Sequence, residues 1–196
     1  MKRMSVLVVL AGTVFWFGGA LPQAAEGAAG SSRAAHDFAV YSEYSDSNKP
    51  MVAGANTRVF NRVEIESGHS ISLDKATGVV TLRPGTYHIT ASSIVTFYDP
   101  VADTDGKVTN LARSWGGYCR LRYKDKPARE DAPIQFGSIS SANMLPSLID
   151  TYLKVDKKAE IVLDHQAGEK TEGLYLQVMV GGSAAHIFAR ISIERL

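Results

Sequence analysis

The sequence predicts an all-β protein, an antiparallel two-sheet jelly-roll sandwich of about ten strands. The first reason is the stretch 58–97, in which apolar and polar residues alternate between turns that contain Gly, Pro or Asp. Such period-two alternation is typical of half-buried antiparallel strands. The second reason is that strand-forming segments continue to the end of the chain, without the periodicity of an amphipathic helix.

The N-terminal part of the chain precedes the predicted domain. Residues 1–25 begin with Lys2 and Arg3, continue with an apolar stretch and end in small residues, as secretory signal peptides do. Two small-x-small motifs leave the cleavage site open. An uncleaved anchor is the alternative, although a spanning helix needs about 20 apolar residues and this stretch is shorter. We expect a flexible leader at 26–36 and the domain at 37–196. The mature protein is expected to be secreted, periplasmic or on the cell surface, without a stable membrane span.

Ten strands are expected in order along the domain. The first begins at Phe38 and continues through Val40 and Tyr41. The other nine are expected at 59–65, 79–82, 87–97, 118–124, 134–139, 148–155, 159–163, 174–180 and 186–193. The last two of these carry apolar residues on both faces. Because a monomeric sandwich exposes the outer face of each sheet, this pattern indicates contact with another protein.

Composition excludes several classes of protein. The formal net charge is +1 and basic residues are not clustered, so nothing indicates a nucleic-acid partner. Cys119 is the only cysteine, so the chain forms no internal disulfide. It alternates with apolar residues along a predicted strand. A buried small hydrophobic residue is therefore favoured over a reactive or interchain thiol.

Motifs for catalysis or cofactor binding are absent from the sequence. The five histidines are not spaced as metal ligands, and neither a nucleophile elbow nor a phosphate-binding loop occurs. We therefore expect a protein that is not an enzyme and has no cofactor. The exception to consider is calcium, because Asp99, Asp103 and Asp105 offer closely spaced oxygen ligands. Asp and Gly are also common in ordinary turns, which is the alternative explanation.

Motifs in the central stretch resemble one known family. Phe60-Asn61 comes first, Thr77-Gly78 follows, and Pro84-Gly85-x-Tyr87 comes last. In this order the chain resembles the globular head of C1q and the tumour-necrosis-factor-like jelly-roll superfamily, as a bacterial-type domain without a collagen stalk. The sequence departs from the family pattern at Arg190, where a Gly is usual, and at the turn 157–158, where two lysines replace acidic residues.

The resemblance implies a non-enzymatic binding or assembly module that forms a homotrimer and recognises a protein or carbohydrate ligand through surface loops. The interface residues expected on this basis are Tyr175, Met179, His186, Phe188 and Arg190. The candidate recognition loops are 99–115 and 168–173, with Trp115 and Tyr118 as an aromatic platform. A core position for Trp115 is the alternative. A secreted β-sandwich hydrolase or other carbohydrate-active protein is the second functional hypothesis.

Overall fold

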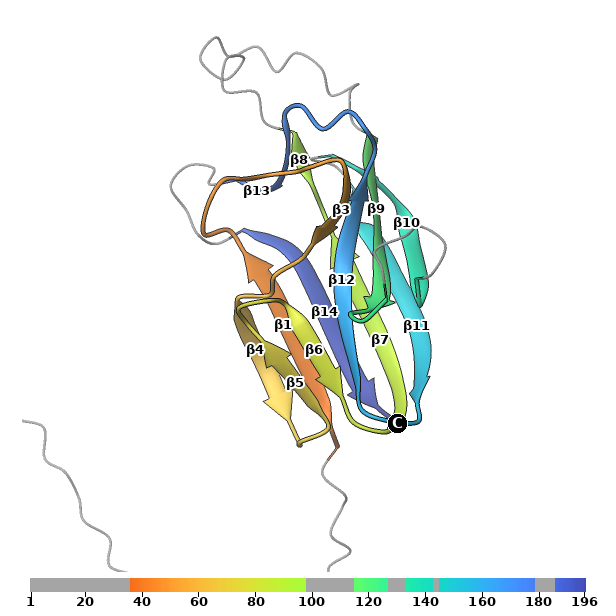
Figure 1. The fold of residues 1–196 in the computed structure, drawn as a ribbon. Coiled ribbons are helices and arrows are strands. Elements are labelled where there is room, and N and C mark those ends of the chain that lie inside the picture. Colours follow the sequence, from red (N-terminus) through yellow and green to blue (C-terminus); the bar gives the residue numbers. More distant parts are fainter. Residues whose placement is uncertain (1–35, 98–114, 127–132, 143–144, 179–185) are drawn as a thin grey trace, which may run out of the picture. The chain divides into compact units, whose positions relative to one another are not determined.

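The computed structural model describes residues 36–97, 115–126, 133–142, 145–178 and 186–196. These residues form fourteen strands joined by turns, and every pair of neighbouring strands is antiparallel (Figure 1). No helix occurs among them that could cross a membrane. The predicted all-β class is confirmed. The predicted signal peptide and leader at 1–25 and 26–35 lie outside the described residues.

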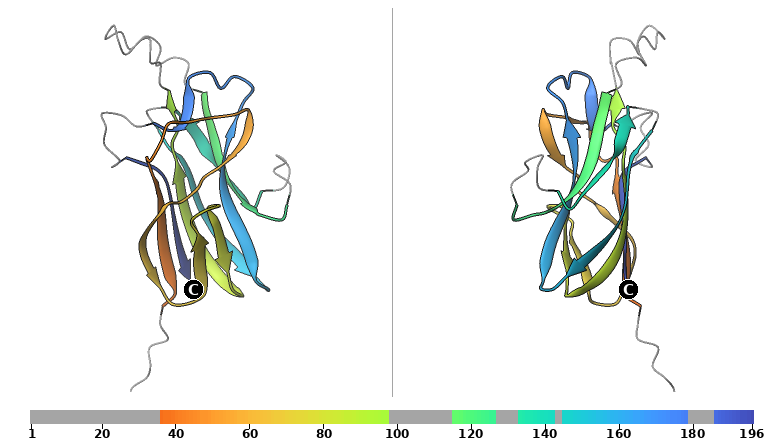
Figure 2. Two further views of the ribbon diagram at one scale, coloured as in Figure 1. Left: turned by 60° about the vertical axis from the view of Figure 1, so that its left-hand side comes forward. Right: turned by 90° about the vertical axis from the view of Figure 1, so that its right-hand side faces the viewer.

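Two sheets pack face to face as the layers of a sandwich (Figure 2). The front sheet has the order β11 (Ser147–Val155), β7 (Gly85–Ser93), β14 (Ile187–Arg195), β1 (Phe38–Tyr44) and β4 (Arg62–Ser67). The back sheet has the order β10 (Gln135–Ser141), β9 (Trp115–Tyr123), β12 (Ala159–Ala167), β6 (Val79–Leu82) and β5 (Ile71–Asp74), and β3 (Gly54–Thr57) also pairs with β12. A small cap sheet at one end contains β2 (Lys49–Pro50), β13 (Leu174–Gln177) and β8 (Thr96–Phe97).

The strand order is that of a jelly roll. The connections β6–β7, β10–β11 and β11–β12 each pass from one sheet to the other. As a result, β14 lies between β1 and β7 in the front sheet, and β12 lies between β6 and β9 in the back sheet. Two interleaved Greek keys of this kind define the double-sheet jelly roll. The predicted architecture is confirmed.

The core between the sheets is built from the inward-facing residues of alternating strands. On β7 the burial alternates strictly, with Tyr87, Ile89 and Ala91 inside. They pack in a cluster of buried residues that includes Leu121 and Ile191 from the other strands. Fully burying a side chain of this size stabilises the fold by roughly 1.5–3 kcal/mol. The hydroxyl of Tyr87 donates to the backbone oxygen of Arg83 at 2.7 Å, which fixes the turn that enters β7.

A second, smaller hydrophobic cluster lies beneath the cap sheet. It contains Met51, Val95, Ala167 and Leu176 among others. On β7 and beyond, the inward positions pass from Ala91 in the first cluster to Ser93 and then to Val95 in the second. On β12 they pass in the same way from Leu163 to His165 and then to Ala167. A polar layer therefore separates the two clusters.

Three strand predictions required correction. Residues 59–61 are not part of a strand, because Asn61 instead bonds Tyr44 through both its amide oxygen and its amide nitrogen, each at 2.9 Å. The predicted strand 87–97 is broken after Ser93, since the Ile94 amide donates to Phe188 and the chain then joins the cap sheet as β8. The predicted strand 174–180 ends as β13 at Gln177. The short strands β2, β3 and β5 were not predicted.

Gly117 holds β9 close to β12. Its φ is +77°, and an added Cβ would lie 1.9 Å from the backbone oxygen of Gln166. We expect Gly117→Ala to lower the free energy of unfolding by about 2 kcal/mol or more, because both the left-handed conformation and the backbone clash are unfavourable. Urea denaturation measures this change. Gly168→Ala is the matched control, since no atom lies within 4 Å of its added Cβ. A loss for Gly168→Ala as large as that for Gly117→Ala would contradict the explanation.

Candidate functional site

A buried polar network forms the layer between the two hydrophobic clusters. It consists of Glu43, Arg58, Ser93, His165 and Gln177, all of which are buried. The guanidinium of Arg58 donates to Ser93 Oγ at 2.8 Å and to Glu43 Oε2 at 3.2 Å. Gln177 donates to the other oxygen of Glu43 at 2.5 Å. The network joins β1, β7, β12 and β13 through the interior, where a charge is tolerated only when paired and hydrogen-bonded.

Arg58 also satisfies backbone oxygens that the strands leave unpaired. It donates to Leu176 O at 2.8 Å and to Ile94 O. The Ile94 contact lies where the chain leaves β7 for the cap sheet. Burial lowers the pKa of Arg58, and the neighbouring carboxylate of Glu43 opposes this shift. The ion pair thus compensates the cost of enclosing the guanidinium.

His165 is held as a neutral ring inside the core. Its Nδ1 accepts from Ser93 Oγ at 2.7 Å, because that hydroxyl already accepts from Arg58, and its Nε2 donates to Gly116 O. Burial, and secondarily the charge of Arg58, lower the pKa of His165 from 6.5 to about 3. Ser93 and His165 resemble a nucleophile and base, but both are 0% exposed. Their arrangement supports a structural role.

A surface hollow lies beside the aromatic residue selected from the sequence. We call it the Tyr118 hollow; it measures about 470 Å³ and is lined by Gly117, Tyr118, Ile139, Gly168, Glu169 and Lys170. Tyr118 and Ile139 are neighbours across the pairing of β9 with β10. The Phe136 ring meets Tyr118 edge-on, with ring centroids 5.8 Å apart. The fold therefore brings Tyr118 together with the predicted loop 168–173. Apolar side chains beside one carboxylate and one ammonium group suit an amphipathic ligand.

An apolar edge runs along β10 and β11, which are the outermost strands of their sheets on the same side of the sandwich. Five large apolar side chains are exposed there. They are Phe136 at 47%, Ile139 at 75%, Leu145 at 62%, Leu148 at 55% and Tyr152 at 69%. Ile139 lines the Tyr118 hollow and Leu148 lines a hollow on the outer face of the front sheet, so these side chains flank the edge on both outer faces of the sandwich. Exposed apolar side chains grouped in this way mark an interaction site more often than scattered residues do.

A shallow hollow of about 410 Å³ lies on the outer face of the front sheet. We call it the front hollow; Thr90, Ser92, Leu148, Arg190 and Ser192 are among the residues that line it. Arg190, Ser92 and Leu148 occupy one row across β14, β7 and β11. Small hydroxyl side chains thus form its floor, with Leu148 and the exposed Arg190 at its sides.

The predicted interface residues are dispersed. Arg190 and His186 are exposed and Tyr175 is half-buried. Met179 lies outside the described residues. Phe188 is only 6% exposed within a single copy, so it has little surface to offer a second one. On the last strand the large apolar side chain left exposed is Ile187, at 43%, while more exposed apolar side chains lie on and between β10 and β11.

The other predicted site residues lie at the limits of the described chain. Asp99, Asp103 and Asp105 are outside it, so calcium binding stays a prediction. Trp115 begins β9, but its side chain is also outside the described part. Within that part, no three His, Cys, Asp or Glu side chains are grouped as a metal site. Cys119 is buried as predicted, and burial raises the pKa of its thiol.

The residues that sequence reasoning missed are those of the apolar edge. Ile139 and Tyr152 stand in predicted strands, and their alternation with inward residues was visible. Which strands would be outermost was not, because that depends on pairing between distant segments. Arg58 gave no signal at all, since its side-chain partners Glu43 and Ser93 are far from it in sequence.

Comparison with known proteins gives structural neighbours only. No protein-family model matches the chain, and no curated protein matches it. The crystal structure of murine APRIL at pH 8.0 is 12% identical, with 82% of this chain and 99% of that chain covered and a TM-score of 0.48. The globular domain of the zebrafish complement 1qA protein is 14% identical, with coverages of 81% and 94% and a TM-score of 0.38. At these identities the similarity concerns the fold.

The lowered pKa of His165 predicts acid sensitivity. In the unfolded chain His165 is protonated below about pH 6.5, whereas in the folded protein it stays neutral down to about pH 3. Stability should therefore fall as the pH drops through this window, by at most about 1.4 kcal/mol per pH unit. His165→Gln should flatten the slope even though it lowers stability at every pH. Hydrogen bonds from Ser70 and Thr77 lower the pKa of Asp37 and Asp74, so the stability that these carboxylates contribute is lost mainly below pH 3.8, outside this window.

The measurement is urea denaturation at a series of pH values between 3.8 and 6.5. His69→Gln serves as the control, because His69 is exposed in a turn and belongs to no part of the network. An unchanged slope in the His165→Gln variant would show that the buried ring does not govern this dependence.

Proposed function

We propose that this chain is a secreted, non-enzymatic binding and assembly module that acts as a homotrimer and recognises a protein or carbohydrate ligand through its surface loops. The observation that carries the proposal is the apolar edge on β10 and β11. The signal-peptide pattern of residues 1–25 supports export. The resemblance of the Phe60-Asn61 and Thr77-Gly78 motifs to C1q-like domains supports the trimer.

Assembly would join two different surfaces of the copies. The apolar edge of one copy would cover the front face of the next, where the front hollow provides a concave surface with small side chains. A contact between unlike surfaces leaves a free surface on each end copy, so further copies can add until the rotation between neighbours closes a ring. Burying Leu145 and Tyr152 in this way removes two of the most exposed apolar side chains of the edge from water and leaves the Tyr118 hollow, which Ile139 lines, open to a ligand.

Ligand recognition is assigned to the Tyr118 hollow. Its walls combine β9, β10 and the connection between β12 and β13, so a rigid sandwich positions a variable loop. A hydrolase would need two carboxylates facing one cleft. The Tyr118 hollow contains one, Glu169, so its geometry favours binding over catalysis. Calcium bound by Asp99, Asp103 and Asp105 is part of the same proposal, in which it supports the candidate recognition loop 99–115.

Light scattering on the mature protein should give three times the mass of one chain. Leu145→Glu combined with Leu148→Glu should weaken self-association by at least about a hundredfold, because two carboxylates would have to lose their water at the contact. Val52→Glu is the matched control, since Val52 is 62% exposed but lies on the connection between β2 and β3. A wild-type protein that stays monomeric at high micromolar concentration would refute the assembly.

Ligand recognition can be tested on an immobilised array of glycans and peptides. We expect any ligand that binds the wild-type protein through the Tyr118 hollow to lose at least about tenfold in affinity with Tyr118→Ala, because an aromatic anchor is removed. Ile65→Ala removes an exposed apolar side chain from β4, at the opposite edge of the front sheet, and controls for general loss of apolar surface. Ligands that bind both variants as well as the wild type would place recognition outside this hollow.

A further inference from the structure

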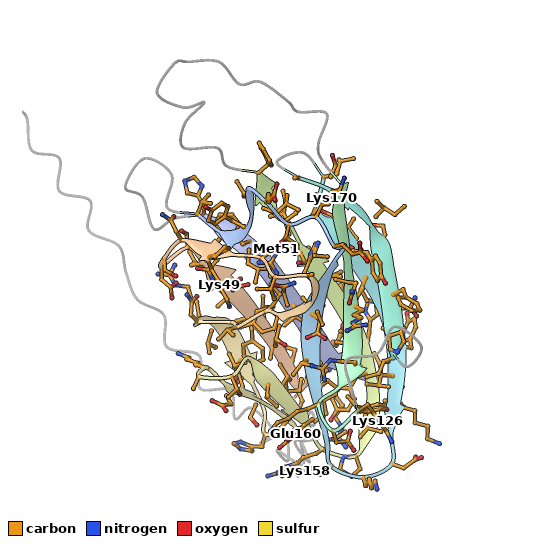
Figure 3. The ribbon with its side chains drawn as sticks, turned by 45° about the horizontal axis from the view of Figure 1, so that its top comes forward. Lys49, Met51, Lys126, Lys158, Glu160 and Lys170 are labelled. Atoms are coloured by element: carbon orange, nitrogen blue, oxygen red, sulfur yellow. The ribbon has the colours of Figure 1, made fainter. Side chains whose placement is uncertain are left out.

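A lysine-rich hollow lies at the end of the sandwich away from the cap sheet. It measures about 540 Å³ and is formed by the end of β9, the end of β11 and the turn into β12. Lys126, Lys154, Lys157 and Lys158 line it together with Tyr123. Figure 3 shows Lys126 and Lys158 at this end of the molecule, and Lys49 and Lys170 at the other. We call it the lysine hollow.

Four lysines and three carboxylates, Asp125, Asp156 and Glu160, line the lysine hollow, so its lining carries a net charge of +1. Glu160 is paired with Lys124 at 3.0 Å, and Asp156 lies 3.8 Å from Lys154. Among the described residues, no carboxylate oxygen lies within 4.0 Å of the ammonium groups of Lys126, Lys157 or Lys158. Three lysines of the hollow therefore have no ion-pair partner among the residues that the structure describes.

The walls of the lysine hollow are held in place by buried groups. Asp164 is buried and binds Arg122 at 2.5 Å, and Thr57 donates to its other oxygen at 2.8 Å. Arg122 in turn donates to the backbone oxygens of Tyr123 at 3.2 Å and Lys126 at 3.2 Å. This arrangement anchors the backbone of Lys126 to the core, so the position of the lysine does not depend on a free loop.

The fold also fixes the opposite wall of the lysine hollow. β11 ends at Val155 and β12 begins at Ala159, so Lys157 and Lys158 stand in a connection of only residues 156–158. Lys158 also lines an adjoining hollow of about 460 Å³ that contains Arg83. The guanidinium of Arg83 likewise has no carboxylate within 4.0 Å among the described residues. The adjoining hollow also contains one carboxylate, Glu66, which accepts from the Tyr41 hydroxyl at 2.6 Å, so the two cationic side chains there face one carboxylate.

The lining indicates the chemistry of the ligand. Asp125 and Asp156 stand among the lysines as hydrogen-bond acceptors, which the backbone of duplex DNA cannot use because it has no hydroxyl groups. A concave wall also suits a chain better than the flat surface of a membrane. Carboxylates accept hydrogen bonds from hydroxyl groups, and the half-buried ring of Tyr123 offers an apolar face. Sugars that carry separated anionic groups satisfy all three features.

We infer that the lysine hollow binds an anionic polysaccharide, with sulfate or uronate groups on Lys126, Lys157 and Lys158 and sugar hydroxyls on the interleaved carboxylates. A single copy contains every residue of this site, so it goes beyond the proposed assembly and does not rest on it. In a ring of copies the same site would be repeated, which raises avidity for a long chain.

The inference can be tested with dextran sulfate as the probe and uncharged dextran as the reference, by isothermal titration calorimetry on the mature chain. We expect dextran sulfate to bind, uncharged dextran not to bind, and affinity to fall with added salt because the contacts are exposed charges. Lys126→Gln combined with Lys158→Gln should weaken binding at least about tenfold. Circular dichroism and light scattering on this variant should match the wild type, which separates loss of the site from loss of folding or assembly.

The matched control is Lys49→Gln combined with Lys75→Gln, which removes the same net charge from residues that line neither hollow. It should bind dextran sulfate within about twofold of the wild type. If both double variants weakened dextran sulfate binding equally, the affinity would depend only on the net charge of the protein, and the inference would be overturned. Absence of dextran sulfate binding would overturn it as well. A duplex oligonucleotide that binds through Lys126 and Lys158 as tightly as dextran sulfate would overturn the polysaccharide assignment.

Discussion

The buried guanidinium of Arg58 is the constraint on which the arrangement of this sandwich depends. It reaches Glu43 on β1, Ser93 on β7 and the backbone beside β13, so three strands must take up their observed positions before the charge is satisfied. Buried ion pairs add little net stability compared with apolar residues of similar size, but a broken pair is strongly unfavourable. The network therefore selects one register of the strands, while the two hydrophobic clusters on either side supply most of the favourable free energy.

The same interior polar groups determine how the surface sites are built. His165 fixes the backbone at Gly116, immediately before the residues that begin the Tyr118 hollow. At the other end, Asp164 holds Arg122 and thereby the wall of the lysine hollow. These two anchoring residues are adjacent on β12, with His165 facing the core and Asp164 facing the opposite side of the sheet. One central strand thus supports both ends of the molecule.

The sequence was sufficient for the fold and insufficient for most of the site. Alternation along 87–93, together with the turns around Gly78 and Gly85, identified the strands whose inward residues make the core. The very short strands β2 and β3 were not predicted, because so few residues do not reveal an alternation of apolar and polar side chains. They form where β13 and β12 provide pairing partners. Tyr118 and the loop 168–173 were selected as separate candidates, and the structure places them beside one hollow. The burial of Phe188 was not foreseen, because alternation does not reveal which outer faces a single copy covers for itself.

Both ends of the domain meet at one pole of the sandwich. The backbone amide of Arg195 donates to Asp37 O at 2.8 Å, and the side chain of Arg195 lies 3.5 Å from the carboxylate of Asp37. In a cyclic arrangement every copy has the same polarity along the rotation axis. All N-terminal extensions would then emerge on one side, leaving the cap sheets and the Tyr118 hollows directed the other way. Fusion partners attached at either terminus would accordingly be gathered on a single side and would not obstruct the opposite one.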